Sequence, residues 1–151
     1  MLTNEFLTKA RFALGPALDV GATPSGFRRL VPITGGSFDG PRLHGRVLPG
    51  GEDRQLFRPD GVLEVEARYS LETHDGVVVV VTNKGLWHGP ADIGARMMQG
   101  ETVDPSLYYF RTSARFEAPG GQSYSWLNRM VIIGTAAYEP GNVVLSFFAV
   151  T

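Results

Sequence analysis

Glycine and proline interrupt this 151-residue sequence so often that it has little room for long helices. It holds 19 glycines and 10 prolines, and the longest internal stretches without either are 62–75, 106–118 and 122–133. None of these comfortably holds several helical turns, whereas each suits a strand of ordinary to long length. The sequence therefore predicts an all-β chain.

Two features of residues 62–81 predict a β-hairpin. From Leu63 to Glu72, apolar and polar residues alternate with the period of two that a strand requires. An Asp-Gly pair at 75–76 then precedes the apolar run 77–81, and two apolar runs around such a pair are typical of a hairpin. The same order of strand, tight turn and strand recurs downstream. There the predicted strands are 108–118, 123–138 and 143–150, with turns at 119–121 and 139–142.

Weaker strand signals precede this region at 6–14, 26–33 and 42–48, which gives about eight to ten strands in total. One short helical turn is predicted near 90–99, where Pro90 opens it and Gly100 ends it. Exposed strand edges invite aggregation, so this many strands must close into a barrel or stack as a sandwich. We predict one domain, residues 1–151, folded as an antiparallel β-barrel.

Composition narrows the classes of function. The chain has fourteen basic and fifteen acidic residues. The resulting net charge of −1 argues against binding to nucleic acid or to an acidic membrane surface. The chain has no cysteine, which excludes disulfides and thiolate chemistry. No secretory signal pattern is visible, and the longest apolar run, 77–81, is too short to span a membrane. We expect a cytoplasmic protein, and a homodimer is plausible on general grounds.

The glycine pairs at 35–36 and 50–51 invite two interpretations. A phosphate-binding loop needs glycines that lead directly into a helix N-terminus, and neither pair does so. The alternative is that the glycines form tight turns and bulges at the corners of a barrel. The sequence favours the second interpretation.

Metal and acyl-enzyme chemistry find no support in the motifs. The three histidines, His44, His74 and His88, have none of the spacings that metal sites use. A carboxylate-rich calcium loop is absent, and so is the GxSxG motif of serine hydrolases. We therefore expect neither a metal nor a cofactor.

Several unusual strings resemble one known family. They are RRLVPITGGSFDGPRLHGRVLPGGED, VEARYSLETHDG, YYFRTSARFE and YSWLNRMVIIG, in that order along the chain. Together they resemble the family named domain of unknown function 3237. The resemblance implies a small antiparallel β-barrel, similar in shape to calycins and to allene-oxide-cyclase-type barrels, and no settled common activity. The family commonly has an aromatic residue directly after Asp53, whereas this chain has Arg54. If that position lines the barrel mouth, the ligand preference of this member differs.

Polar residues in the middle of predicted strands are the candidates for chemistry. One interpretation places them on the outer face of the barrel, where ion pairs contribute only about 0–1 kcal/mol each. The other places them in the interior, where a carboxylate beside guanidinium groups would hold a ligand's oxygen atoms. Glu66 and Tyr69 lie on opposite faces of one strand, so the two cannot both point inward. The candidate catalytic residues are Asp53, Glu66, Arg68 and Arg111, and the candidate substrate-binding residues are Tyr69, Tyr109, Trp126 and Asn128.

Two classes of function remain. The first is a cofactor-free isomerase, cyclase or lyase for a hydrophobic, oxygenated molecule of aromatic or polyketide-like kind. In it, Asp53 or Glu66 carries the proton, while Arg68 or Arg111 stabilises a developing enolate or carboxylate. The alternative is a protein that binds a hydrophobic ligand without chemistry. A carboxylate inside the barrel, within hydrogen-bond reach of a guanidinium or phenol, would favour the enzyme, whereas a wholly apolar interior would exclude it.

Overall fold

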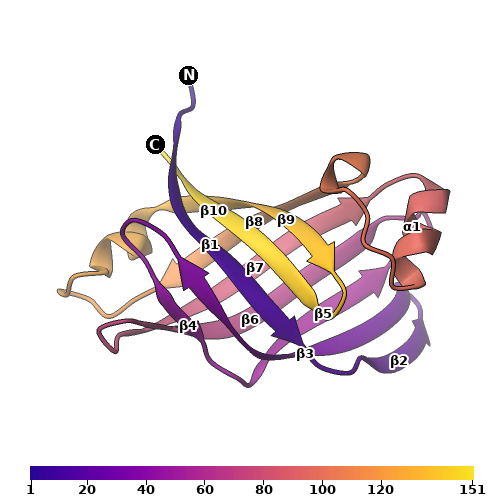
Figure 1. Cartoon of the computed structure of the whole chain (residues 1–151), viewed down its shortest axis with the longest axis horizontal. Coiled ribbons are helices and arrows are strands. Elements are labelled where there is room, and N and C mark those ends of the chain that lie inside the picture. Colours follow the sequence, from indigo (N-terminus) through magenta and orange to yellow (C-terminus); the bar gives the residue numbers. More distant parts are fainter.

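Ten strands make up most of the chain, in agreement with the spacing of glycine and proline. The computed structural model describes residues 1–151. The strands are β1 (Asn4–Leu14), β2 (Leu18–Thr23), β3 (Gly26–Asp39), β4 (Gly45–Val47), β5 (Gly51–Phe57), β6 (Leu63–Thr73), β7 (Val78–His88), β8 (Tyr109–Glu117), β9 (Val131–Glu139) and β10 (Asn142–Val150). One α-helix, α1 (Ala91–Met98), and two 3-10 helices, η1 (Pro105–Leu107) and η2 (Ser125–Arg129), complete the fold (Figure 1).

The strands form a closed, eight-stranded antiparallel barrel, which confirms the predicted fold. Around the barrel the order runs β1, β10, β9, β8, β7 and β6. Both β4 and β5 then pair with β6 on one side and with β3 on the other, so these two strands share one position. Pairing of β3 with β1 closes the ring, and β2 pairs only with β3.

Alternation along each strand decides which side chains point inward. In β8 the even-numbered residues from Phe110 to Phe116 are buried, and the odd-numbered residues are exposed. In β6 the buried residues are the odd-numbered ones, among them Leu63, Tyr69 and Leu71. The apolar face of each strand thus faces the interior, because removing apolar surface from water is the main stabilising contribution to folding. We call this interior the lumen.

The two glycine pairs have different roles. Gly50, with φ of 105°, lies in the turn before β5, as predicted. Gly35 and Gly36 instead lie within β3, where no turn forms, but the register of β3 against β1 shifts beside Gly35, in keeping with the predicted bulge. At Gly36, with φ of 143°, β1 approaches so closely that a Cβ would overlap the carbonyl oxygen of Arg11. The glycine is needed for the close approach of two strands.

The predicted strand over 123–138 is wrong in its first half. Residues Ser125–Arg129 form η2, and β9 begins only at Val131. The side chain of Asn128 holds this segment by accepting from the N–H of Ala118 at 2.8 Å and donating to its carbonyl oxygen at 2.9 Å. These bonds are local and replace pairing with a neighbouring strand.

The short helix predicted near 90–99 is confirmed as α1, which follows Pro90 and precedes Gly100. Helix α1 lies at one end of the barrel, and the segment that contains η2 lies at the other (Figure 1). The two chain termini lie together, because β1 and β10 are adjacent and Thr3 hydrogen-bonds to Thr151. None of the helices has the length and apolar character needed to cross a bilayer.

Candidate functional site

Strand β5 places two polar side chains inside the barrel. Asp53 and Gln55 are only 8% and 6% exposed, whereas Arg54 between them points outward, where it pairs with Glu52 at 3.3 Å. Alternation along the strand explains this arrangement, because residues two apart share a face. A carboxyl and an amide therefore occupy positions that would otherwise hold apolar side chains.

The sheet register brings further polar residues onto the same level of the lumen. Asp53 lies opposite Ala67 of β6, which in turn lies opposite Asn83 of β7. Two residues along β7 from Asn83, Gly85 pairs with Thr112 of β8, and Thr112 pairs in turn with Gly134 of β9. The small neighbours leave space beside the polar side chains.

Asp53 is held by a hydrogen bond that leaves one of its oxygens free. Its Oδ2 accepts from Nε2 of Gln55 at 3.1 Å, and the same nitrogen lies 3.3 Å from the hydroxyl of Tyr138. Oδ1 of Asp53 is buried and has no hydrogen-bond partner within the protein. Burial raises the pKa of this carboxyl to about 6, the charge of Glu52 adds to the rise, and the bond from Gln55 opposes it.

The two phenols nearest to this carboxyl remain protonated at neutral pH. Burial raises the pKa of both Tyr69 and Tyr138 above the ordinary value for tyrosine, and the charge of Asp53 raises each further. Among these three groups, Asp53 alone titrates near neutral pH. The lumen thus combines one proton-exchanging group with hydroxyls that keep their protons.

The lumen contains a small inner chamber of about 30 Å³ with an unusual wall. Five polar side chains line it, and all of them except Tyr138 have a buried atom with no hydrogen-bond partner in the protein. Most buried polar groups in proteins are hydrogen-bonded, so this cluster is unusual, although the Tyr69 hydroxyl is close enough to Asn83 for that side chain to lower its pKa. The atoms are Oδ1 of Asp53, Oη of Tyr69, Oδ1 of Asn83 and Oγ1 of Thr112.

A larger cavity of about 460 Å³ lies toward the end of the barrel that carries α1, and we call it the mouth pocket. Gln55 and Tyr138 line it, and Tyr138 also lines the inner chamber together with Leu14. Tyr138 therefore lies between the two cavities. Apolar side chains form most of the remaining wall, namely Leu14, Phe57, Leu63, Trp87, Met97 and Met98.

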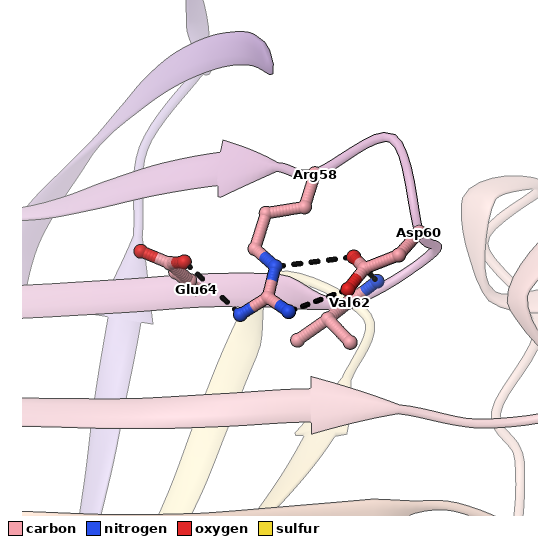
Figure 2. A network of polar contacts seen from close by, with 4 residues as sticks. All are labelled: Arg58, Asp60, Val62 and Glu64. Carbon is pink, nitrogen blue, oxygen red and sulfur yellow. Dashed lines mark hydrogen bonds and ion pairs between the residues drawn. The ribbon is translucent and has the colours of Figure 1, made fainter. Parts of the chain in front are cut away.

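The turn between β5 and β6 forms part of the rim of the mouth pocket and is fixed by a polar network (Figure 2). Arg58 donates from Nε to Oδ1 of Asp60 at 3.1 Å and from Nη2 to Oδ2 at 2.5 Å. Its Nη1 also reaches Glu64 at 3.2 Å, and Asp60 accepts from the N–H of Val62 at 3.3 Å. This two-pronged contact orients the turn that carries Gly61 into the pocket wall.

Two of the eight residues predicted from the sequence lie in the lumen, namely Asp53 and Tyr69. The placement of Glu66 and Arg68 in the lumen is wrong, because their side chains are 37% and 74% exposed and pair with each other on the outer face. They alternate with the apolar residues of β6, which occupy the interior.

The placement of Tyr109 and Arg111 in the lumen is wrong for the same reason. Both residues are exposed on β8, and the guanidinium of Arg111 lies 5.7 Å from the Tyr109 ring. The remaining two predicted residues belong to η2, at the end of the barrel away from α1. Trp126 stacks under the guanidinium of Arg42 at 3.9 Å, and Asn128 is engaged with the backbone of Ala118. Neither lines the mouth pocket or the inner chamber.

Sequence reasoning missed five lumen residues, Gln55, Trp87, Asn83, Thr112 and Tyr138. Three of them carry a signal that could have revealed them. Gln55, Asn83 and Thr112 are polar residues in phase with the apolar, inward-facing set of their strands. Arg54, where this chain departs from the aromatic residue common in the family, lies on the outer face and does not line the mouth pocket. No group of three or more His, Asp or Glu side chains is placed to hold a metal ion.

Comparison with known sequences supports the resemblance seen in the motifs. The family model described as Protein of unknown function (DUF3237) matches residues 2–150. A UPF0311 protein of Rhodopseudomonas palustris is 42% identical over 144 residues, which cover 95% of this chain and 94% of the relative. A more distant relative, the hydroalkoxylation enzyme phnH of Penicillium herquei, is 27% identical over 131 residues, which cover 87% of this chain and 72% of the relative.

Solved structures share the fold. A protein of unknown function from Rhodopseudomonas palustris superposes with a TM-score of 0.93 at 38% identity, covering 100% of this chain and 99% of the other. A beta-barrel like protein from Acinetobacter baumannii gives a TM-score of 0.87 at 36% identity, covering 100% and 97%. An enzyme from Penicillium herquei has the same fold, with a TM-score of 0.74 at 24% identity, covering 99% and 95%.

Proposed function

Because this chain belongs to the DUF3237 family, we propose that it is an enzyme whose lumen binds a hydrophobic, oxygenated small molecule of aromatic or polyketide-like kind. The proposed reaction is an isomerisation, a cyclisation or a lyase-type addition or elimination, carried out by general acid–base catalysis without a cofactor. The observation that carries the proposal is Asp53, a carboxyl group buried in the lumen whose pKa is raised to about 6.

The raised pKa suits a group that both accepts and returns a proton. Acid–base catalysis is most efficient when the pKa of the catalytic group lies near the operating pH. An addition of an O–H group across a carbon–carbon double bond removes the proton from oxygen, forms a carbon–oxygen bond and delivers a proton to carbon. The proton count balances, and Asp53 ends the cycle in its starting state. The relative named as a hydroalkoxylation enzyme supports this type of reaction.

The ligand is proposed to occupy the mouth pocket. Tyr138 lines both cavities, and one nitrogen of Gln55 contacts both its hydroxyl and the carboxylate of Asp53. In the proposed arrangement the reacting group of the ligand extends past Tyr138 toward the inner chamber, where Oδ1 of Asp53 has no partner in the protein and takes up and returns the proton. The Tyr138 hydroxyl keeps its own proton at neutral pH, so it can donate a hydrogen bond to an oxygen of the ligand.

The experiment that tests the proposal replaces Asp53 and follows turnover. A suitable first probe is 2-allylphenol, whose hydroxyl can add across its own side-chain double bond, with the product measured by chromatography. We expect Asp53→Asn to lower the rate by about 10²–10⁴, the usual contribution of a positioned acid–base group. The matched control is Asp39→Asn, since Asp39 is exposed at the end of β3. Equal rates for the two variants and the wild type would exclude Asp53 as the proton carrier.

A ligand-binding protein without chemistry is the second candidate. It is favoured by one observation, that Asp53 lies behind Gln55 and Tyr138 and does not itself line the mouth pocket. In that case the pocket would bind ligands that no variant converts to product. Tight binding of a probe together with unchanged probe after long incubation with wild-type protein would favour this second function.

A further inference from the structure

Charged side chains at the mouth pocket already have partners. Only three of the residues that line the pocket are charged, one basic and two acidic. Each forms an ion pair with a residue outside the pocket wall, so the charge that it presents to a ligand is largely balanced. The pairs are Arg29 with Asp19 at 2.7 Å, Glu101 with Arg96 at 3.0 Å, and Glu139 with Arg11.

Deeper in the barrel no cation is available. The buried polar or charged residues of the chain are Thr8, Asp53, Gln55, Thr73, Asn83 and Thr112, and none of these is basic. A carboxylate or phosphate group entering the pocket would lose water without gaining a countercharge, which is strongly unfavourable. It would also approach Asp53, whose negative charge is already disfavoured by burial.

A cationic ligand would also find few stabilising contacts in the mouth pocket. Oδ2 of Asp53 accepts from Gln55, and its Oδ1 belongs to the wall of the inner chamber rather than to the mouth pocket. The two glutamates of the pocket are engaged with arginines. An ammonium group in the mouth pocket would therefore compete with Arg11 and Arg96 for the two glutamates that line it.

The floor of the pocket instead offers one hydrogen-bond donor and one acceptor side by side. Gln55 turns its nitrogen toward the carboxylate of Asp53, and that nitrogen's two protons are directed to Asp53 and to Tyr138. The side-chain carbonyl oxygen of Gln55, Oε1, is left as a hydrogen-bond acceptor. The Tyr138 hydroxyl accepts from Gln55, so its own proton remains to be donated.

We infer that the mouth pocket selects an uncharged ligand with a flat apolar body and a phenolic or enolic hydroxyl, which accepts a hydrogen bond from Tyr138 and donates one to Oε1 of Gln55. This inference rests on the proposed function in taking the mouth pocket as the ligand site. The cavity of about 460 Å³ falls in the range of small-molecule sites. The apolar wall, with Trp87 and Phe57, suits the faces of a ring.

Three probes with one naphthalene ring test the selectivity. They are 2-naphthol, 2-naphthoate and naphthalen-2-ylmethylammonium, titrated into the wild-type protein at neutral pH by calorimetry. We expect 2-naphthol to bind at least about ten-fold more tightly than either charged probe, because only the charged probes lose the hydration of an ion. Equal or tighter binding of a charged probe, or no binding of 2-naphthol, would overturn the inference.

Two matched variants test the hydroxyl contact. Tyr138→Phe removes the proposed donor, and Tyr109→Phe makes the same change on the outer face, where Tyr109 is exposed. We expect Tyr138→Phe to weaken 2-naphthol binding roughly three- to ten-fold, the loss of one neutral hydrogen bond. Binding of 2-methylnaphthalene should not change in this variant, and Tyr109→Phe should change neither. If Tyr138→Phe weakens both probes equally, the residue has only a structural role and the assignment is wrong.

The result of the binding tests does not depend on the result of the turnover test, so the two experiments separate the selectivity of the pocket from the acid–base role of Asp53. Selective binding of 2-naphthol together with full turnover by Asp53→Asn would remove the acid–base proposal and leave the selectivity intact. Equal binding of all three probes, with turnover lost in Asp53→Asn, would remove the selectivity and leave the enzyme.

Discussion

At the scale of single residues, the decisive feature is a polar side chain at a position where the strand alternation calls for an apolar one. Asp53 and Gln55 on β5, Asn83 on β7 and Thr112 on β8 all share this feature. Burying such groups without partners is costly, and four of the unpartnered atoms in this chain line the inner chamber. Such unpartnered groups reduce stability, and a role in binding or catalysis would account for their presence.

The pKa of Asp53 predicts a specific dependence of stability on pH. Its pKa is raised from 3.8 to about 6 in the folded state. Between these values the folded state binds more protons than the unfolded state, so the contribution of Asp53 to stability is fully present below the lower value. It is lost as pH rises through about 6. Relative to Asp53→Asn, the wild type should lose about 2.5 kcal/mol of unfolding free energy between pH of about 4 and 8.

Urea unfolding of both proteins at several pH values measures this difference. Asp39→Asn serves as the control, because that residue is exposed and its profile should follow the wild type. Parallel profiles for the wild type and Asp53→Asn would show that the folded carboxyl titrates at its ordinary pKa.

At the scale of elements, β3 makes closure of the barrel possible. Its first half pairs with β5, and its second half pairs with β4 on one side and β1 on the other. Gly36 lies in the second half, where it faces Phe12 of β1 and Val47 of β4. The missing side chain lets the backbones of β1 and β3 approach, and the glycines of this segment therefore serve the backbone, as the sequence suggested, but within a strand.

We expect Gly36→Ala to destabilise the fold by roughly 3 kcal/mol or more, because the added Cβ overlaps the carbonyl of Arg11 and the backbone φ of 143° is unfavourable for alanine. Gly120→Ala is the matched control. Its Cβ would meet no atom within 4 Å, and the change should stay within about 0.5 kcal/mol. Thermal or urea unfolding measures both, and similar stabilities for the two variants would contradict this role of Gly36.

At the scale of the whole molecule, the strands at the two ends of the chain complete the ring. β1 pairs with β10 through one edge and with β3 through the other, and it supplies Leu7, Ala10 and Phe12 to the core. Without β1, the edges of β10 and β3 would carry unpaired backbone groups. Open edges of this kind promote association with other chains.

Deletion of residues 1–14 should therefore give an aggregated protein, as measured by size-exclusion chromatography with light scattering. Deletion of residues 1–3, which precede β1, should leave the elution volume and the far-UV circular dichroism spectrum unchanged. A soluble, folded product from the longer deletion would show that β1 is dispensable for closing the barrel.

The sequence by itself determined the strand content, the hairpin around Asp75 and Gly76, the short helix after Pro90 and the alternating faces of β6 and β8. These features depend on neighbours along the chain, so local patterns are enough to predict them. It also selected Asp53, on a strand that begins just after the Gly50 turn.

Only the tertiary structure decided which residues meet inside the barrel. Gln55 and Tyr138 are 83 residues apart in sequence, and their contact depends on how β3 and β1 close the ring. From the sequence, Glu66 and Arg111 were as good candidates for catalysis as Asp53. In the structure the apolar faces of their strands point into the barrel, so these two charged side chains point into water. Strand register between distant segments is set by packing of the whole barrel, and no local pattern carries it.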